Sequence, residues 1–188
     1  MLDSYLLTLH GLTLRQLADA GQLADVIGLD RTEVEIALEK AVANGAAMAA
    51  RGSNMITPAG RELLDAAYPE VFAQLRTDAA ISAAVDAFEV GVNSDVLAAT
   101  TDWQLEGPDP TIVDRLHAIN KKLVRVLAPL AAADPGFGRF FDRLSAALDH
   151  VDAGENDYVS GVRVDSFHTV WFQMHEHVLR LTGRERPE

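Results

Sequence analysis

The stretch DSFHTVWFQMHEH, residues 165–177, gathers residue types that can carry chemistry. Histidines can bind a metal ion or exchange protons near neutral pH, and adjacent large aromatics such as Trp171 and Phe172 can form the wall of a binding pocket. If the stretch is helical, His168 and His175 lie about 10 Å apart along the axis, because each residue adds about 1.5 Å. That separation is too long for both to bind one ion directly, and the i, i+4 histidine pair of the HExxH motif is absent. The spacing therefore predicts no metal site.

A catalytic arrangement is not indicated either. Asp165 and His168 could mimic the orienting half of a triad, but Ser166 would point in a different direction from His168 on a helix. The chain has no Gly-x-Ser-x-Gly, no phosphate-binding loop and no dinucleotide fingerprint. We therefore predict no catalytic residue and no cofactor, and we do not expect an enzyme.

A helix over 164–181 would place the residues of this stretch on distinct faces, at about 100° per residue. One stripe contains Asp165, His168, Phe172, His175 and Leu179, and the adjoining stripe contains Val164, Phe167, Trp171, Met174 and Val178. Together the two stripes form a broad face that we expect to turn into a helical bundle. We expect His177, on the opposite side, to be solvated together with Glu176 and Arg180.

Two interpretations of this broad face remain open. In the first, it forms core and dimer contacts, because large aromatics on an apolar face are ordinary core and Asp165 can pair with His168. In the second, it lines a pocket for a small organic molecule with a polar end. The residues of that predicted pocket are Trp103, His117, Asn120, His168, Trp171, Phe172 and His175.

Charge and composition exclude several classes of protein. The 188 residues include 28 acids and 16 bases, a formal net charge of −12, so any DNA binding would depend on a local basic patch. The lack of cysteine excludes a disulfide scaffold and suits the cytoplasm. No apolar run is long enough to span a membrane, and the N-terminus lacks the pattern of a signal peptide. We expect a cytoplasmic protein of one domain or two small ones.

The first 66 residues contain an ordered series of helix signals. Leucines from Leu2 to Leu17 recur at helical spacing, and Gly28 closes a short second helix over 22–28. Asp30 with an acid three residues later is a capping-box pattern that begins a third helix, and Asn44-Gly45 ends it. The apolar face of this third helix contains Val34, Leu38, Ala41 and Val42.

A hairpin and another helix follow. Residues 51–54 form a turn signal, residues 55–57 an extended run, and Thr57 caps a helix that has Pro58 at its first position. The order of helix, short helix, tight turn, helix, hairpin and helix is that of a winged helix-turn-helix.

Two segments in this region resemble the MarR-like winged-helix family of bacterial regulators. They are GLDRTEVEIALEKAVANG, at 28–45, and ITPAGRELL, at 56–64, and the resemblance covers about a third of the chain. The resemblance implies a homodimer that reads DNA with the third helix. A small-molecule ligand would change the spacing or tilt of the two winged helices by a shift in a two-state equilibrium.

The residues that would contact DNA lie on the third helix and the hairpin, and the charges around them are unfavourable. The candidates are Arg31, Thr32, Glu35, Lys40, Arg51 and Asn54. Residues 30–44 contain four acids and two bases, and residues 1–70 contain ten acids and five bases. An acid that faces a phosphate is repelled and loses hydration without compensation. The alternative function is a protein-interaction module that does not bind DNA, since a fold does not determine a function.

Residues 67–188 have the pattern of a helical bundle. Predicted helices cover about 72–105, 111–133, 137–151 and 164–181, with an interruption near 91–94 and a bend near Pro129. The last predicted helix, with DSFHTVWF, resembles a group of actinobacterial regulator-like proteins. The sequence thus predicts a mainly α protein, with a winged helix-turn-helix at 1–66 and a dimerising, ligand-sensing helical bundle at 67–188. The favoured function is that of a transcription regulator.

Overall fold

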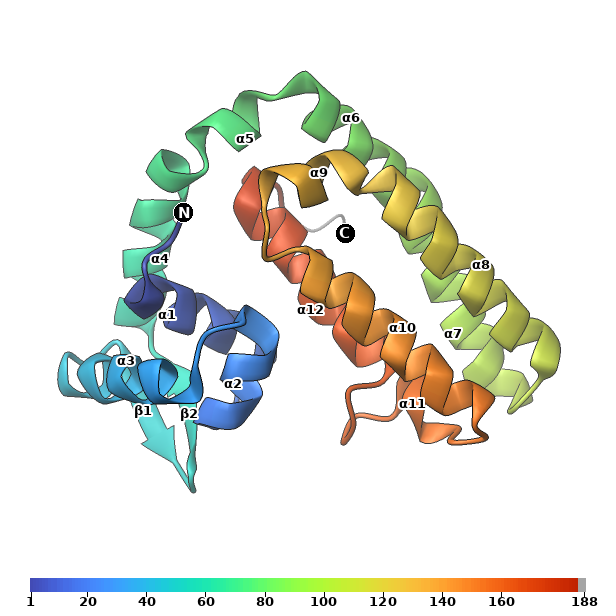
Figure 1. Ribbon diagram of the computed structural model, residues 1–188, viewed down its shortest axis with the longest axis horizontal. Helices are drawn as coiled ribbons and strands as arrows, with labels where there is room; N and C mark the ends of the chain where they lie inside the picture. Colours follow the sequence, from blue (N-terminus) through green and yellow to red (C-terminus); the bar gives the residue numbers. More distant parts are fainter. Residues whose placement is uncertain (186–188) are drawn as a thin grey trace. The chain divides into compact units, whose positions relative to one another are not determined.

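The computed structural model describes residues 1–185 (Figure 1). Over this range the chain is mainly helical, as predicted, and its strands form one antiparallel hairpin. The chain divides into two compact units, which are described separately below. Unit 1 contains Met1–Arg76 and residues 179–185, and unit 2 contains Thr77–Val178. The boundary expected at residue 66 falls inside a helix that continues to Val71.

Unit 1 consists of helices and a small hairpin at its edge (Figure 1). The order of its elements is α1 Ser4–Arg15, α2 Ala20–Ile27, α3 Arg31–Ala43, β1 Ala47–Ala50, β2 Ser53–Ile56, α4 Pro58–Val71 and α5 Ala73–Thr77, whose last residue begins unit 2. Helix α1 packs against α2, α3 and α4, so it forms the centre of this unit. The side chains of Leu9, Leu12, Leu23, Val34 and Leu64 are buried in its core. The guanidinium of Arg76 donates to the carbonyl oxygens of Arg180 and Leu181, which holds the returning chain end in unit 1.

The helix boundaries of unit 1 follow the capping signals, but the capping box predicted at the start of α3 is found at the start of α2 instead. Gly28 ends α2 in the left-handed conformation, with φ of +68°. Asp30 caps α3, as predicted, and accepts from the backbone N–H of Thr32 at 2.8 Å. The carboxylate of Glu33 instead accepts a hydrogen bond from the Ser4 hydroxyl. The full capping box of this region lies one helix earlier, where Asp19 and the Gln22 side chain satisfy each other's backbone N–H groups.

The hairpin turn is tighter than the sequence suggests. Arg51 and Gly52 are its two central residues and have φ of +52° and +85°, the backbone of the primed turns that match strand twist. Ala50 pairs with Ser53, so Ser53 and Asn54 belong to β2 and not to the turn as predicted. The backbone of Asn54 also exchanges two hydrogen bonds with Ala18, which ties the hairpin to the segment before α2.

Unit 2 is wholly helical over its described elements (Figure 1). These are α6 Ala79–Ala87, η1 Phe88–Asn93, α7 Ser94–Glu106, α8 Pro110–Val126, α9 Ala128–Ala133, α10 Gly138–Asp152, α11 Asp157–Ser160 and α12 Phe167–Thr182, whose last turn belongs to unit 1. The interruption expected near 91–94 is a π-helical segment, η1, which continues α6 directly into α7. The bend expected near Pro129 lies between α8 and α9, because proline lacks the N–H that would bond to the carbonyl four residues earlier.

The predicted start of the last helix is wrong, and one short helix was not predicted. The segment between the helices predicted at 137–151 and 164–181 contains this short helix, α11. Helix α12 begins at Phe167 and not at 164, because the Ser166 hydroxyl accepts from the backbone N–H of Thr169 and caps the helix there. Asp165 therefore lies before the helix, and the expected stripe that joined it to His168 does not form.

Candidate functional site

The histidines of α12 are part of the unit 2 core. His175 Nε2 lies 2.7 Å from Glu89 Oε1 on η1, and the two side chains are 4% and 13% exposed. The His175 ring packs edge-on against Phe88, which in turn stacks on Trp171 at 5.1 Å between ring centroids. The buried face of α12 is therefore core packing, as in the first of the two interpretations, and the core includes the polar pair His175 and Glu89.

His177 was expected to be solvated, and that prediction is wrong. Its side chain is buried, and Nε2 lies 2.8 Å from the Asp134 carboxylate. Phe137 and Phe140, at the start of α10, pack against its ring. Helix α12 is therefore covered on a second side. Phe172, expected on the buried face, is 40% exposed.

Asp165 and His168 also have different surroundings from those expected. The Asp165 carboxylate accepts from Arg143 Nη2 on α10 at 2.8 Å, and that guanidinium group also donates to Gln173. His168 is half-buried, and the loss of water around its ring lowers its pKa below the ordinary value of 6.5.

We predict that an NMR titration of the His168 ring protons will give a pKa below 6.5. The unfolded chain takes up this proton at the ordinary pKa, whereas the folded chain resists it. Acidification below 6.5 therefore removes stability through this residue, and the loss continues until the folded-state pKa is passed. A His168 pKa at or above 6.5 would contradict the assigned burial.

The residues predicted to form a ligand pocket are distributed over separate places in unit 2. Trp103 borders a hollow of about 460 Å³ with Pro108 and Asn156. His117 and Asn120 border another, of about 430 Å³, between α8 and α10. Their side chains bond to Asp152 and Ser145 respectively. The remaining four, on α12, are the core and surface residues described above. Within residues 1–185, no group of three histidines or acids is placed to hold a metal ion.

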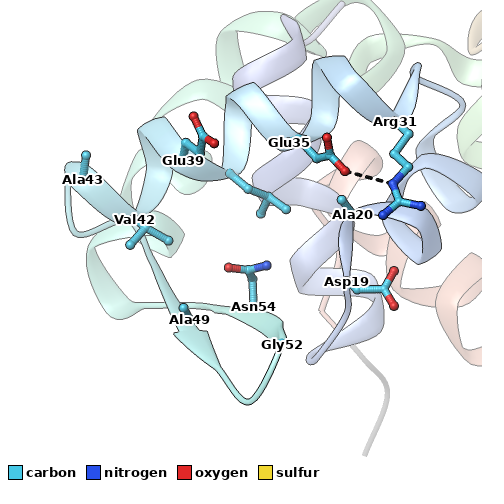
Figure 2. Close-up of a pocket in the computed structure, with 11 residues that line it drawn as sticks. Asp19, Ala20, Arg31, Glu35, Glu39, Val42, Ala43, Ala49, Gly52 and Asn54 are labelled. Atoms are coloured by element: carbon cyan, nitrogen blue, oxygen red, sulfur yellow. Dashed lines mark hydrogen bonds and ion pairs between the residues drawn. The ribbon is translucent and has the colours of Figure 1, made fainter.

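A different hollow, of about 610 Å³, lies in unit 1 between α3 and the hairpin (Figure 2). We call it the groove. Helix α3 forms one wall, β1, the turn and β2 form the other, and the start of α2 closes one end. Small residues on the hairpin side leave the space open between the walls. The lining residues are Asp19, Ala20, Arg31, Glu35, Leu38, Glu39, Val42, Ala43, Ala49, Gly52 and Asn54.

The groove is acidic. Among its described lining residues, three carboxylates, of Asp19, Glu35 and Glu39, accompany the single guanidinium of Arg31. Arg31 Nε donates to Glu35 Oε1 at 2.9 Å, and this bond raises the pKa of Arg31 (Figure 2). The one cation of the groove is thus already directed at a neighbouring carboxylate.

The six residues predicted to contact DNA do not form one basic surface. Arg31, Glu35 and Asn54 line the groove. Thr32 is exposed on the first turn of α3, and Arg51 is exposed at the hairpin turn. The Lys40 ammonium lies over the Tyr5 ring, 4.8 Å from its centroid, on another face of α3.

Sequence reasoning missed the apolar part of the groove. Val42 was expected on the buried face of the third helix, but it is 39% exposed and lines the groove. Leu38 lies beside it, and Ala49 faces it from β1. The signal that could have indicated this site is the acidic i, i+4 pair Glu35 and Glu39 beside an apolar residue three positions on.

No family model, curated protein or solved structure matches this chain. Among the described helices, none is both long enough and apolar enough to cross a membrane.

Proposed function

We propose that unit 1 is a winged helix-turn-helix whose groove binds a protein partner and not DNA. The order of three helices, a two-stranded hairpin and a fourth helix supports the winged-helix assignment, as does the left-handed Gly28 between α2 and α3. In such a fold the exposed face of the third helix, beside the wing, is the surface available to a ligand. The groove lies between these two elements.

The acidity of the groove is the observation that carries this proposal. DNA-binding modules neutralise phosphates with several lysines and arginines, and each unpaired carboxylate at such a surface repels the backbone. Here the lining includes three acidic residues, Asp19, Glu35 and Glu39, and Glu35 already accepts from the guanidinium of Arg31. Lys40 lies over the Tyr5 ring, and Arg51 is not among the described lining residues, so neither changes the sign of the groove lining.

The chemistry of the groove defines the partner. The exposed Val42 and Ala49 in its lining offer burial to aliphatic side chains, whereas Leu38 is itself largely buried. The acidic lining residues favour a partner segment that carries lysine or arginine beside those aliphatic side chains. A basic amphipathic segment of a protein satisfies both requirements. Apolar contact would supply most of the affinity, and the charges would supply orientation and selectivity.

Titration of a labelled DNA duplex at low salt tests this proposal. We expect the 188-residue chain to show no saturable binding up to about 100 µM, and no salt-dependent slope. The double variant Glu35→Lys/Glu39→Lys changes the groove charge by +4 and should gain measurable, salt-sensitive affinity. The matched control, Glu62→Lys/Glu70→Lys, adds the same charge on exposed positions of α4 outside the groove lining and should gain less. Tight, salt-dependent binding by the unaltered protein would instead support the MarR-like regulator.

A further inference from the structure

Helix α8 of unit 2 carries the most basic segment of this acidic chain. Residues 115–133, which run from α8 into α9, contain four bases and no acid, whereas the whole chain has a net charge of −12; the exposed acid Asp114 lies on α8 just before this segment. Two of these bases are engaged within unit 2, since Arg115 pairs with Asp102 at 2.6 Å and Lys122 pairs with Asp95 at 2.7 Å. The other two, Lys121 and Arg125, are exposed and make no ion pair or hydrogen bond within residues 1–185.

Lys121 and Arg125 lie on one face of α8, because residues four apart are neighbours on a helix surface. Val124, beside them, is 40% exposed, and Ala118 is exposed about one turn before Lys121. We call these four residues the α8 face. Other exposed cations without a described partner, Arg51, Arg61 and Arg163, are on three different segments of the chain. The α8 face therefore combines adjacent unpaired cations with exposed apolar side chains.

This pattern is the complement of the groove. On α3, Glu35 and Glu39 are four residues apart and exposed, with Leu38 and Val42 beside them. On α8, Lys121 and Arg125 have the same spacing, with Val124 between them. Carboxylates and cations at equal spacing, about 5–6 Å between Cβ atoms, can pair two by two along neighbouring helices. The aliphatic side chains would then meet between the two rows of charge.

We infer that the partner of the groove is a second copy of this chain, which inserts its α8 face against α3 and the hairpin. This inference rests on the proposed function, because it names the occupant of the same groove. Two copies of charge −12 repel each other at long range, but salt at about 0.15 M screens that repulsion beyond about 8 Å. Contacts within the groove are shorter than this distance, so local complementarity can act under these conditions.

Variants that reverse the charge of the groove or of the α8 face test this inference. Analytical ultracentrifugation at about 0.15 M salt measures the molecular mass, and hence the self-association, of each variant. The unaltered protein should self-associate. Glu35→Lys/Glu39→Lys gives a cationic groove, and Lys121→Glu/Arg125→Glu gives an anionic α8 face, so each variant alone should associate at least about tenfold more weakly. In an equimolar mixture, the cationic groove of the first variant meets the anionic α8 face of the second, and the unaltered α8 face of the first meets the unaltered groove of the second. Both contacts again join opposite charges, so the mixture should associate. All four positions are exposed, so the circular dichroism of each variant should match that of the unaltered protein.

The mixture makes the test independent of whether one variant folds poorly, since a damaged protein cannot be rescued by its counterpart. A monomeric unaltered protein at about 100 µM would overturn the inference, as would variants that associate normally or a mixture that fails to recover. If the unaltered protein is monomeric but its groove still binds a basic amphipathic peptide, the second-copy inference fails and the proposed function stands. If the groove binds duplex DNA, the proposed function itself fails.

Discussion

Replacing Gly60 by alanine is expected to lower the free energy of unfolding by about 3 kcal/mol, which is at the upper end for overpacking. A Cβ atom at this position would lie 2.1 Å from the carbonyl oxygen of Ala46 and 2.8 Å from the Ile56 side chain. Ala46 cannot easily move away. Its N–H donates to Ala41 and its carbonyl oxygen accepts from Thr57, so the backbone is held on both sides of the contact.

Urea unfolding followed by circular dichroism measures this effect, and hydrogen exchange at the hairpin amides localises it to unit 1. The matched control is Gly138→Ala, at the first position of α10, where an added Cβ meets nothing within 4 Å. That control should leave stability unchanged or raise it by about 0.5 kcal/mol, because alanine restricts the unfolded chain more than glycine does. Equal stability of the Gly60 and Gly138 variants would contradict the close approach of α4 to Ala46.

The second large effect is expected for His175→Ala, which should cost about 3 kcal/mol. The substitution removes a buried ring that packs on Phe88, and it leaves the Glu89 carboxylate without its bond to His175 in a largely buried position. Loss of buried volume and loss of a hydrogen-bond partner are separate costs of about 1–3 kcal/mol each, and they partly add. The free energy of unfolding of unit 2 therefore depends on this pair.

Tryptophan fluorescence reports this change directly, because both tryptophans of the chain, Trp103 and Trp171, lie in unit 2. His168→Ala is the matched control on the same helix. His168 is only half-buried, so its loss should cost below about 1 kcal/mol. If the two variants lose similar stability, the Glu89–His175 pair is not a structural element of the core.

Local signals predicted most of the helix boundaries in unit 1. Asp30 and Thr57 cap helices by side-chain oxygens, and Gly28 ends one by adopting a positive φ. These effects act within a few residues, so the sequence alone is sufficient to identify them. The same reasoning placed the hairpin correctly but assigned two strand residues, Ser53 and Asn54, to its turn.

Side-chain environments in unit 2 could not be predicted in the same way. His177 is buried because Phe137 and Phe140 pack on its ring, and its Nε2 lies 2.8 Å from the carboxylate of Asp134, 43 residues earlier. Asp165 turns toward Arg143 on α10, and His175 meets Glu89 on a π-helical segment. Helical periodicity describes one face of one helix, whereas these contacts depend on which helices pack together. The five predicted stripe positions are therefore in different surroundings: His175 and Leu179 are buried, His168 is half-buried, Phe172 is exposed, and Asp165 lies before the helix.

The candidate site was predicted in part. Three of the six residues named for the third helix and the hairpin, Arg31, Glu35 and Asn54, line the groove. The apolar lining was missed because Val42 was assigned to the core by its spacing. Val42 lies at the edge of the apolar stripe of α3, and whether it is covered depends on how closely the hairpin approaches α3. Helical spacing in the sequence gives no information on that distance.

An amide-resolved NMR titration of the 188-residue chain with two probes in parallel tests most directly whether the groove binds a protein partner or DNA. One probe is a basic amphipathic peptide, and the other is a DNA duplex at the same low salt concentration. We predict that the peptide will shift the amide signals of Glu39, Ala49 and Asn54 in a saturable manner, and that the duplex will leave them unchanged. Saturable shifts of these amides with the duplex, and none with the peptide, would contradict the account.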